Sequence, residues 1–173
     1  MRNSGLIFLL SLLFFTSCVD KKKPTDPKKY KEPLIKINKY LVGKDYESIK
    51  SYTERHGWNM QVSETGLWYE IKKDSSINTQ KAVENATVII NYKVKLLNSK
   101  ICYSSDSLGP KTFKISYGGV EPGLEEGILM MNKGDKARFI MPPHLAHGLL
   151  GDGDKIPVRA TIIYEVELID LSY

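Results

Sequence analysis

Apolar side chains at every second position of two long segments are the feature that most limits how this 173-residue chain can fold. Residues 87–97 and 160–168 each carry an apolar side chain at every second position. Because successive side chains of a β-strand point to opposite faces, this period predicts strands with one buried face. Shorter apolar segments between turn residues predict four more strands, at 67–72, 101–104, 112–117 and 136–141. Together they indicate a half-buried antiparallel sheet.

One segment within this β pattern has helical spacing instead. It starts at Pro122, carries acidic side chains in its first turn, and repeats apolar residues at Leu124, Ile128 and Met131. Proline suits the first position of a helix, and residues three or four apart share one helix face. The predicted fold class is α+β: a curved antiparallel sheet wrapped around one short helix, preceded by a small helical N-terminal segment.

The first 17 residues have the layout of a signal peptide. Arg2 is followed by an apolar run over residues 5–15 and by the small residues Thr16 and Ser17. The run is shorter than the about 20 residues that a membrane-spanning helix needs. Cys18 then resembles the cysteine of a bacterial lipobox, which predicts that it becomes the acylated first residue of the mature chain. The alternative is an ordinary signal peptide followed by an incidental cysteine.

Residues 18–32 are rich in Lys and Pro and almost without apolar side chains, so they predict a lipid-anchored flexible tether. Such an anchor would hold the protein on a bacterial membrane in the cell envelope, facing the periplasm or the cell surface. With Cys18 acylated, Cys102 is the only free thiol of the mature sequence, and we expect it to be buried.

Residues 33–63 predict a helical segment made of two short helices. The first would run from Pro33 to Gly43 and the second from Asp45 to Gly57, each with apolar residues at helical spacing. Helices this short are not stable alone in water. They must pack on each other, on the main domain, or on a second copy of the chain, which would make a homodimer.

Several motifs of the remaining residues, 64–173, come in a characteristic order. They are Tyr92, the Tyr-Ser-Ser of residues 103–105, Phe113 before Gly118, residues 120–127, residues 133–138, residues 142–148, Ile156 with Pro157, and the last strand at 161–168. This order resembles the FK506-binding-protein family of peptidyl-prolyl isomerases over the whole of this domain. The lipid signal and helical segment are most similar to lipoprotein isomerases of Bacteroidetes-type bacteria, including those associated with gliding motility.

The resemblance implies a proline-binding pocket whose residues carry over by position. Its walls would be formed by Tyr92, Phe113, Val120, Glu121, Leu124, Ile156 and Tyr164. Three further positions depart from the family pattern: Cys102 stands in place of a phenylalanine, Tyr103 in place of the pocket aspartate, and His147 in place of the tyrosine that hydrogen-bonds the substrate carbonyl.

The resemblance also implies an activity, cis-trans isomerisation of X–Pro bonds in polypeptides. Rotation about a peptide bond has a barrier of ~18–20 kcal/mol, and the twisted state is less polar than the planar amide. An apolar pocket that excludes water favours the twisted state, so no cofactor is implied. The expected partners are proline-containing segments of exported proteins that are folding. Given the three departures, the alternative is a non-catalytic proline-binding or chaperone-like accessory lipoprotein.

The other patterns point to neither a metal site nor nucleic acid. His144 and His147 lie three residues apart beside prolines, and no Cys or carboxylate completes a metal site there. Asp152 and Asp154 predict a solvated turn in the loop over the pocket. The formal net charge of +5 comes largely from the Lys-rich segment after Cys18, and no basic face interleaved with aromatic residues indicates nucleic-acid binding.

Overall fold

The computed structural model describes residues 27–74 and 80–173 of the chain. The predicted signal peptide, the predicted lipidation site Cys18 and the first part of the predicted tether lie outside these residues. Within the described residues, no helix is both long enough and apolar enough to cross a membrane.

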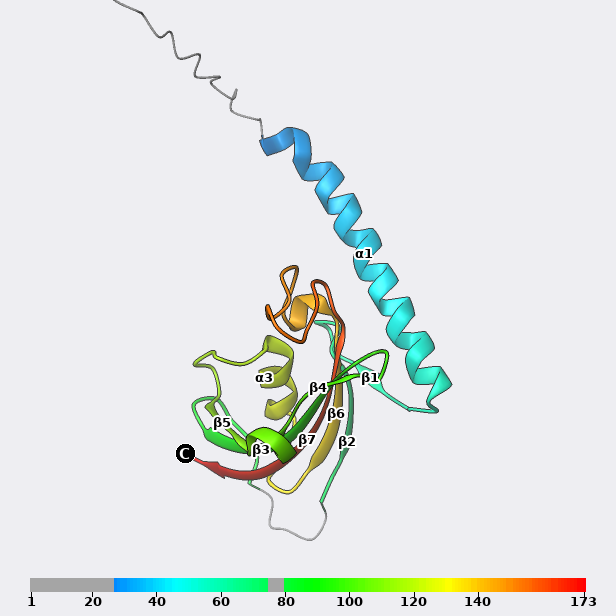
Figure 1. Ribbon diagram of the computed structural model, residues 1–173. Coiled ribbons are helices and arrows are strands. Elements are labelled where there is room, and N and C mark those ends of the chain that lie inside the picture. The colour runs from blue at the N-terminus through cyan, green and yellow to red at the C-terminus, as the bar shows by residue number, and fades with distance from the viewer. Residues whose placement is uncertain (1–26, 75–79) are drawn as a thin grey trace, which may run out of the picture. The chain divides into compact units, whose positions relative to one another are not determined.

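Seven strands form one antiparallel sheet within the described part of the chain (Figure 1). Its hydrogen-bonded order is β1-β2-β6-β7-β3-β4, and β5 pairs with β3 beside this path. The strands are β1 (Gln61–Val62), β2 (Trp68–Lys72), β3 (Thr87–Leu96), β4 (Ile101–Ser104), β5 (Lys111–Lys114), β6 (Lys136–Met141) and β7 (Ile162–Ser172). The six predicted strands are all present and differ only at their ends. The predicted α+β class is confirmed.

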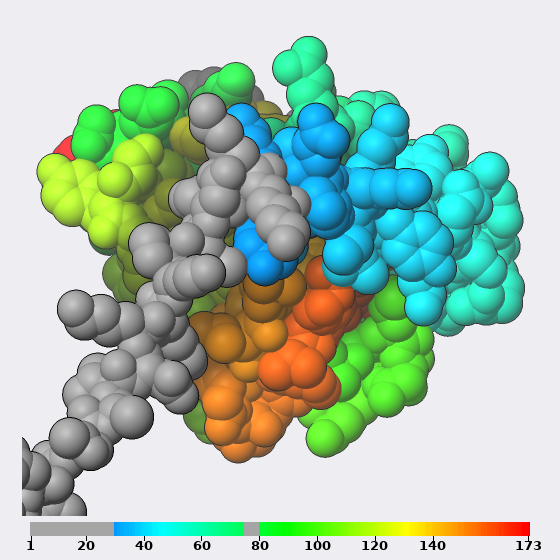
Figure 2. All heavy atoms as spheres, turned by 90° about the horizontal axis from the view of Figure 1, so that it is seen from above, coloured from blue at the N-terminus to red at the C-terminus, as the bar shows by residue number. Residues whose placement is uncertain are grey.

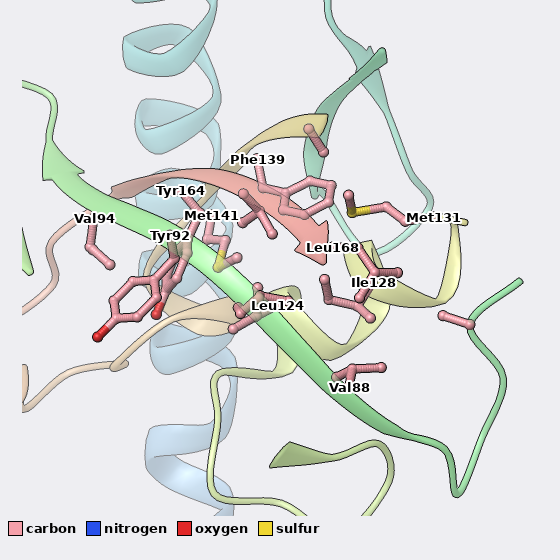
Figure 3. Close-up of a cluster of buried hydrophobic side chains, with 14 of the residues drawn as sticks. Val88, Tyr92, Val94, Leu124, Ile128, Met131, Phe139, Met141, Tyr164 and Leu168 are labelled. Atoms are coloured by element: carbon pink, nitrogen blue, oxygen red, sulfur yellow. The ribbon is translucent and has the colours of Figure 1, made fainter. Parts of the chain in front are cut away.

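The main core lies between the concave face of this sheet and the helix α3 (Pro122–Leu129), as Figures 1 and 3 show. Every second side chain of β3 from Val88 to Val94 is buried, and the side chains between them are half-buried. From α3, Leu124 and Ile128 are fully buried. The period-2 pattern of the strand and the helical pattern of α3 therefore meet in one apolar layer, as predicted.

Close approach of α3 to β6 depends on a glycine. A Cβ atom on Gly127 would lie 2.6 Å from Cζ of Phe139, whose ring is fully buried. Real Cβ atoms do not come this close to a neighbour. The glycine therefore leaves the space that the Phe139 ring fills.

The N-terminal helical segment differs from its prediction. One helix, α1 (Pro27–Arg55), replaces the two predicted helices, begins inside the predicted tether, and runs through both Pro33 and Gly43. The boundaries predicted at these two residues are wrong. A glycine within a helix costs only about 1 kcal/mol relative to alanine. Once a stable turn exists, each further helical residue adds a hydrogen bond, and the packed turns after Gly43 supply that stable turn.

The second half of α1 packs on the convex face of the sheet. Ile49 and Tyr52 are buried in a second apolar cluster that also contains Trp68, Ile140 and Ile163. At the edge of this contact, an Arg159 guanidinium nitrogen lies 2.9 Å from a carboxylate oxygen of Asp45. The sequence left open whether the helical segment packs on itself, on the main domain or on a second copy of the chain. This half of α1 packs on the main domain.

Three short elements were not predicted: β1, the helix α2 (Ser105–Leu108) and the 3-10 helix η1 (Pro143–Leu145). Elements this short contain too few residues to show a periodic pattern. A local signal does mark α2, because the Ser104 hydroxyl accepts a hydrogen bond of 3.0 Å from the backbone N–H of Asp106 and so caps the helix.

We expect Gly127→Ala to lower the free energy of unfolding by about 1–3 kcal/mol, because the added methyl group forces the Phe139 ring out of its position. Urea unfolding followed by circular dichroism measures this change. Gly43→Ala is the matched control, since nothing lies within 4 Å of a Cβ at that position in α1. The control should be neutral or raise stability by up to about 1 kcal/mol. Equal effects of the two substitutions would contradict this account of the α3 contact.

Candidate functional site

A hollow of about 320 Å³ opens beside the N-terminal end of α3. Its lining comes from β5, from the segment that leads into α3, and from the turn after η1. The lining residues are Lys111, Gly119, Val120, Glu121, Pro122, Ala146 and His147. Pro122 begins α3, so the packing of this helix on the sheet fixes one whole side of the hollow.

Behind this lining lies a wall of buried apolar and aromatic side chains. Leu124, Ile156 and Tyr164 are at most 2% exposed, and Tyr92 is 8% exposed. The rings of Tyr92 and Tyr164 are 6.3 Å apart, and Figure 3 shows their hydroxyl groups at the same end of the core. The lining covers this wall: Lys111 Nζ lies 5.6 Å from the centre of the Tyr92 ring.

The carboxylate of Glu121 joins the wall to the hollow. Its Oε1 atom accepts a hydrogen bond of 2.8 Å from the Tyr164 hydroxyl and one of 3.0 Å from Nε2 of His147. The residue is 8% exposed, and its Oε2 atom is buried with no hydrogen-bond partner among the described residues. Burial first and the Glu121 charge second raise the pKa of both Tyr164 and Tyr92, so both hydroxyls keep their protons.

The loop between η1 and β7 closes another side of the site, and Figure 2 shows it (orange) on the molecular surface. The Tyr103 hydroxyl on β4 donates to Oδ2 of Asp152 in this loop. Oδ1 of Asp152 accepts from the backbone N–H groups of Asp154 and Ile156, at 2.9 and 2.8 Å. Asp152 therefore connects β4 to the loop and holds Ile156 in its place in the wall. The predicted turn is present in this loop, with Asp154 exposed, and the contacts of Asp152 are an addition to that prediction.

These contacts shift the pKa values of both partners. The hydrogen bond to Asp152 is the main cause that raises the pKa of Tyr103 to about 12. Burial acts to raise the pKa of Asp152, but the hydrogen bonds from Tyr103 and from the two backbone N–H groups outweigh it and lower the pKa to about 2. The pair is therefore an un-ionised tyrosine and a carboxylate across the neutral range.

Cys102 also ties β4 to this loop. Its thiol is buried, as predicted, and lies 3.5 Å from the backbone oxygen of Lys155. Burial is the main cause that raises its pKa, so the thiol stays protonated and poorly reactive. Lys155 Nζ in turn lies 4.9 Å from the centre of the Tyr103 ring. Cys102 and Tyr103, the two β4 residues that depart from the family pattern, therefore position the loop.

Ser105 fixes the backbone of the wall tyrosine. Its Oγ atom accepts from the N–H of Tyr92 at 3.1 Å and donates to the carbonyl oxygen of Tyr92 at 3.3 Å. This double contact joins β3 to the start of α2. It gives a structural role to the last serine of the Tyr-Ser-Ser motif.

The structure brings most of the predicted pocket residues together. Around the hollow and its wall lie Tyr92, Val120, Glu121, Leu124, His147, Ile156 and Tyr164, with Cys102 and Tyr103 beside them. Phe113 is half-buried against the core and pairs with Val88, whereas Lys111 is the residue of β5 that lines the hollow. The sequence analysis missed Lys111. Strand alternation could have indicated it, because residues two apart on a strand share a face.

A second hollow, of about 490 Å³, is lined mainly by charged side chains of the sheet, and Tyr92 and Ser105 also reach it. Arg138 pairs there with Glu70 at 3.0 Å, and Lys136 with Glu167 at 3.4 Å. Because most of these charges are paired, we assign the site to the smaller hollow, whose lining contacts both Tyr92 and Tyr164. Among the described residues, no group of three or more His, Cys, Asp or Glu side chains is placed to hold a metal ion.

Comparison with known proteins gives the family. Residues 78–169 match the family model described as FKBP-type peptidyl-prolyl cis-trans isomerase. The chain belongs to this family. It is 33% identical over 131 residues to the FKBP-type peptidyl-prolyl cis-trans isomerase FkpA of Escherichia coli K12, covering 75% of this chain and 45% of FkpA. The chain thus spans about half the length of such relatives.

A shorter relative and a solved structure agree with this membership. FK506-binding protein 2 of Yarrowia lipolytica is 40% identical over 95 residues, which are 54% of this chain and 66% of that protein. The crystal structure of FkpA from Escherichia coli aligns with a TM-score of 0.63 at 28% identity, covering 88% of this chain and 76% of that one. The similarity therefore includes the fold as well as the motifs.

We expect Tyr103→Phe to lower the free energy of unfolding at neutral pH by about 1 kcal/mol, a modest value because solvent screens this partly exposed contact. A carboxylate whose pKa is lowered on folding stabilises the protein above its unfolded pKa and loses this effect as pH falls through the folded value. The difference from wild type should therefore stay constant down to about pH 4 and shrink toward pH 2. Urea unfolding across this range measures it.

Tyr117→Phe is the control for this measurement, because Tyr117 is exposed and does not line the hollow. It should change stability little at any pH. A Tyr103→Phe effect that persists unchanged as Asp152 becomes protonated would contradict the role given to this contact.

Proposed function

We propose that this protein is a peptidyl-prolyl cis-trans isomerase that acts on proline-containing polypeptides. One observation carries the proposal: the lining of the hollow contacts the buried rings of Tyr92 and Tyr164, through Lys111 and Glu121 respectively. Family membership and the relatives named above support the same activity.

The arrangement fits a reaction that is a bond rotation. A proline ring seated between Val120 and His147 would have the aromatic wall behind it and little water around it. As the amide twists it loses resonance and becomes less polar, so an apolar surrounding stabilises the twisted state more than the planar one. The chain needs only to hold the ring and the neighbouring backbone in place.

In this structure, the Lys111 side chain opposes packing of a proline ring in the hollow. Its ammonium group lies over the Tyr92 ring and lines the hollow, so it keeps a strongly hydrated charge where the proline ring must pack. Substrate has to displace this side chain. We infer that Lys111 lowers the rate below what the apolar wall alone would support.

We expect the wild-type protein to catalyse isomerisation of an X–Pro peptide, and Lys111→Leu to raise kcat/KM by about 5-fold, which corresponds to about 1 kcal/mol. A protease-free isomerisation assay measures both rates. Lys114→Leu is the matched control, because it lies on the same strand, does not line the hollow, and has Nζ 4.2 Å from the centre of the Tyr117 ring. It should leave kcat/KM unchanged.

The opposite outcome is equally defined. If neither the wild-type protein nor Lys111→Leu exceeds the uncatalysed rate while a proline peptide binds measurably, the enzyme proposal fails. The non-catalytic proline-binding or chaperone-like alternative then takes its place.

We also propose that the protein is a lipoprotein of the bacterial cell envelope, similar to the gliding-motility-associated isomerases of Bacteroidetes. The sequence supports this through the predicted signal peptide at residues 1–17 and the predicted lipidation site Cys18, which precede a Lys-rich segment, the helix α1 and the isomerase domain 64–173. A lipid at Cys18 would hold the domain near a membrane, on its periplasmic or outer side. Exported proteins that fold there are the proposed clients.

The N-terminal half of α1 supports a further proposal, a homodimer through this helix. Tyr30, Leu34 and Ile37 are 46–61% exposed and continue to Leu41 with alternating spacings of four and three residues. Two helices with such a stripe pack along it, as in a coiled coil. The sequence left dimerisation and packing on the main domain open. The exposed stripe supports dimerisation for the N-terminal half of the helix.

We expect Leu34→Glu with Ile37→Glu to convert the dimer to a monomer, because a charge on each helix would be buried in the shared stripe. Sedimentation equilibrium over a concentration series measures the mass. Ile35→Glu is the control, since Ile35 is 57% exposed but lies off the stripe. A wild-type chain that sediments as a monomer at every concentration would refute the dimer.

A further inference from the structure

The hydrogen bonds of Glu121 determine which nitrogen of His147 carries a proton. A carboxylate can only accept hydrogen bonds. Oε1 of Glu121 accepts one from the Tyr164 hydroxyl at 2.8 Å, and its other partner is Nε2 of His147 at 3.0 Å. Nε2 must therefore be the donor of this contact and carry the proton.

The second ring nitrogen of His147, Nδ1, can then accept a hydrogen bond from a ligand in the hollow. A neutral imidazole has one N–H and one lone pair, so with the proton on Nε2 the lone pair is on Nδ1. Nδ1 has no hydrogen-bond partner among the described residues. The His147 side chain is 28% exposed and lines the hollow, so a peptide bound there can contact its ring.

The charged and titratable groups around His147 are few. Glu121 contacts it directly from the segment before α3, and Tyr164 on β7 contacts it through Glu121. Lys111 on β5 lines the same hollow, and Asp152 interacts with it electrostatically from the loop. The buried, unpartnered Oε2 atom of Glu121 is a further acceptor. The charged side chains nearest His147 are thus two carboxylates, which accept hydrogen bonds, and the Lys111 ammonium, which donates them.

We propose that Glu121 is a positioning residue that holds His147 as a hydrogen-bond acceptor, so that this pocket recognises a peptide N–H of its substrate. The inference rests on the proposed function and specifies its substrate. A tyrosine at this position would donate to a peptide carbonyl. The pair of His147 and Glu121 reverses the direction of that hydrogen bond.

The N–H must come from a neighbour of the proline, because proline has none of its own. The residue after the proline is the one that fits. Its N–H lies on the prolyl side of the rotating bond, so holding it fixes the ring while the preceding residue swings. The preferred ligand is thus an X–Pro–Y segment in which Y is any residue other than proline.

The first experiment reads the proton position directly, without any activity. Long-range ¹H–¹⁵N correlation spectra of the ¹⁵N-histidine-labelled protein at mildly alkaline pH distinguish the two neutral forms of the ring. We expect the Nε2–H form for His147 in the wild type and in Glu121→Gln, which keeps an acceptor oxygen. We expect Glu121→Leu, which removes it, to lose this preference. His56→Phe and His144→Phe, which each remove the signals of one of the other two histidines, assign the spectrum. A wild-type His147 protonated on Nδ1 would overturn the proposal.

The second experiment tests recognition of the peptide. The wild-type protein is given an X–Pro–Ala peptide and a depsipeptide in which an ester oxygen replaces the N–H after the proline. We expect the ester to bind about 5-fold more weakly, as the loss of one hydrogen bond of about 1 kcal/mol predicts. His147→Phe should bind both ligands equally. His144→Phe is the matched control, because His144 contacts the backbone oxygen of Thr65 and does not line the hollow, and it should keep the difference.

The two experiments separate this inference from the proposed function. Equal binding of peptide and ester by the wild-type protein refutes N–H recognition, whether or not the protein is an active isomerase. Selective binding without catalysis supports N–H recognition and refutes the enzyme proposal. If His147→Phe does not fold, the wild-type comparison and the spectra still decide the matter.

Discussion

Packing of α3 against the concave face of the sheet is the contact on which the rest of the structure depends. A helix of eight residues has no stability of its own in water, so its position is set by the apolar side chains it buries. Leu124 and Ile128 are fully buried against the sheet, and Gly127 leaves room for the ring of Phe139. Because the segment from Gly119 to Pro122 leads directly into this helix, the same packing places one side of the hollow.

The opposite side of the hollow is irregular backbone, and polar contacts hold it. The loop before β7 buries little apolar surface apart from Ile156, since Leu149 and Leu150 are both exposed. Asp152 compensates by accepting hydrogen bonds from Tyr103 on β4 and from two backbone N–H groups within the loop. The site thus combines a helix end fixed by apolar packing with a loop fixed by hydrogen bonds. A substitution of Cys102 or Tyr103 on β4 would therefore affect the hollow through this loop.

The fold could be predicted because its strands and α3 each bury a face that leaves a period in the sequence. That period indicated the buried residues of β3 and placed Leu124 and Ile128 on one face of α3. Local signals failed where packing outweighed them, as at Gly43, through which α1 continues. The site was only partly predictable. Positions such as Tyr164 follow from motif order, whereas the partners of Asp152 and Lys111 depend on the path of a loop and on a side-chain conformation.

The charged group in the pocket is explained by recognition better than by stability or chemistry. A bond rotation needs no carboxylate, and a buried charge gives little net stability even when it is paired. Glu121 nevertheless lies 8% exposed behind the hollow, with two donors on one oxygen and none on the other among the described residues. An apolar side chain would fill the same volume without the loss of hydration. In the proposed recognition, what the carboxylate adds is direction: its contact with Nε2 orients the imidazole of His147 and leaves Nδ1 for the peptide.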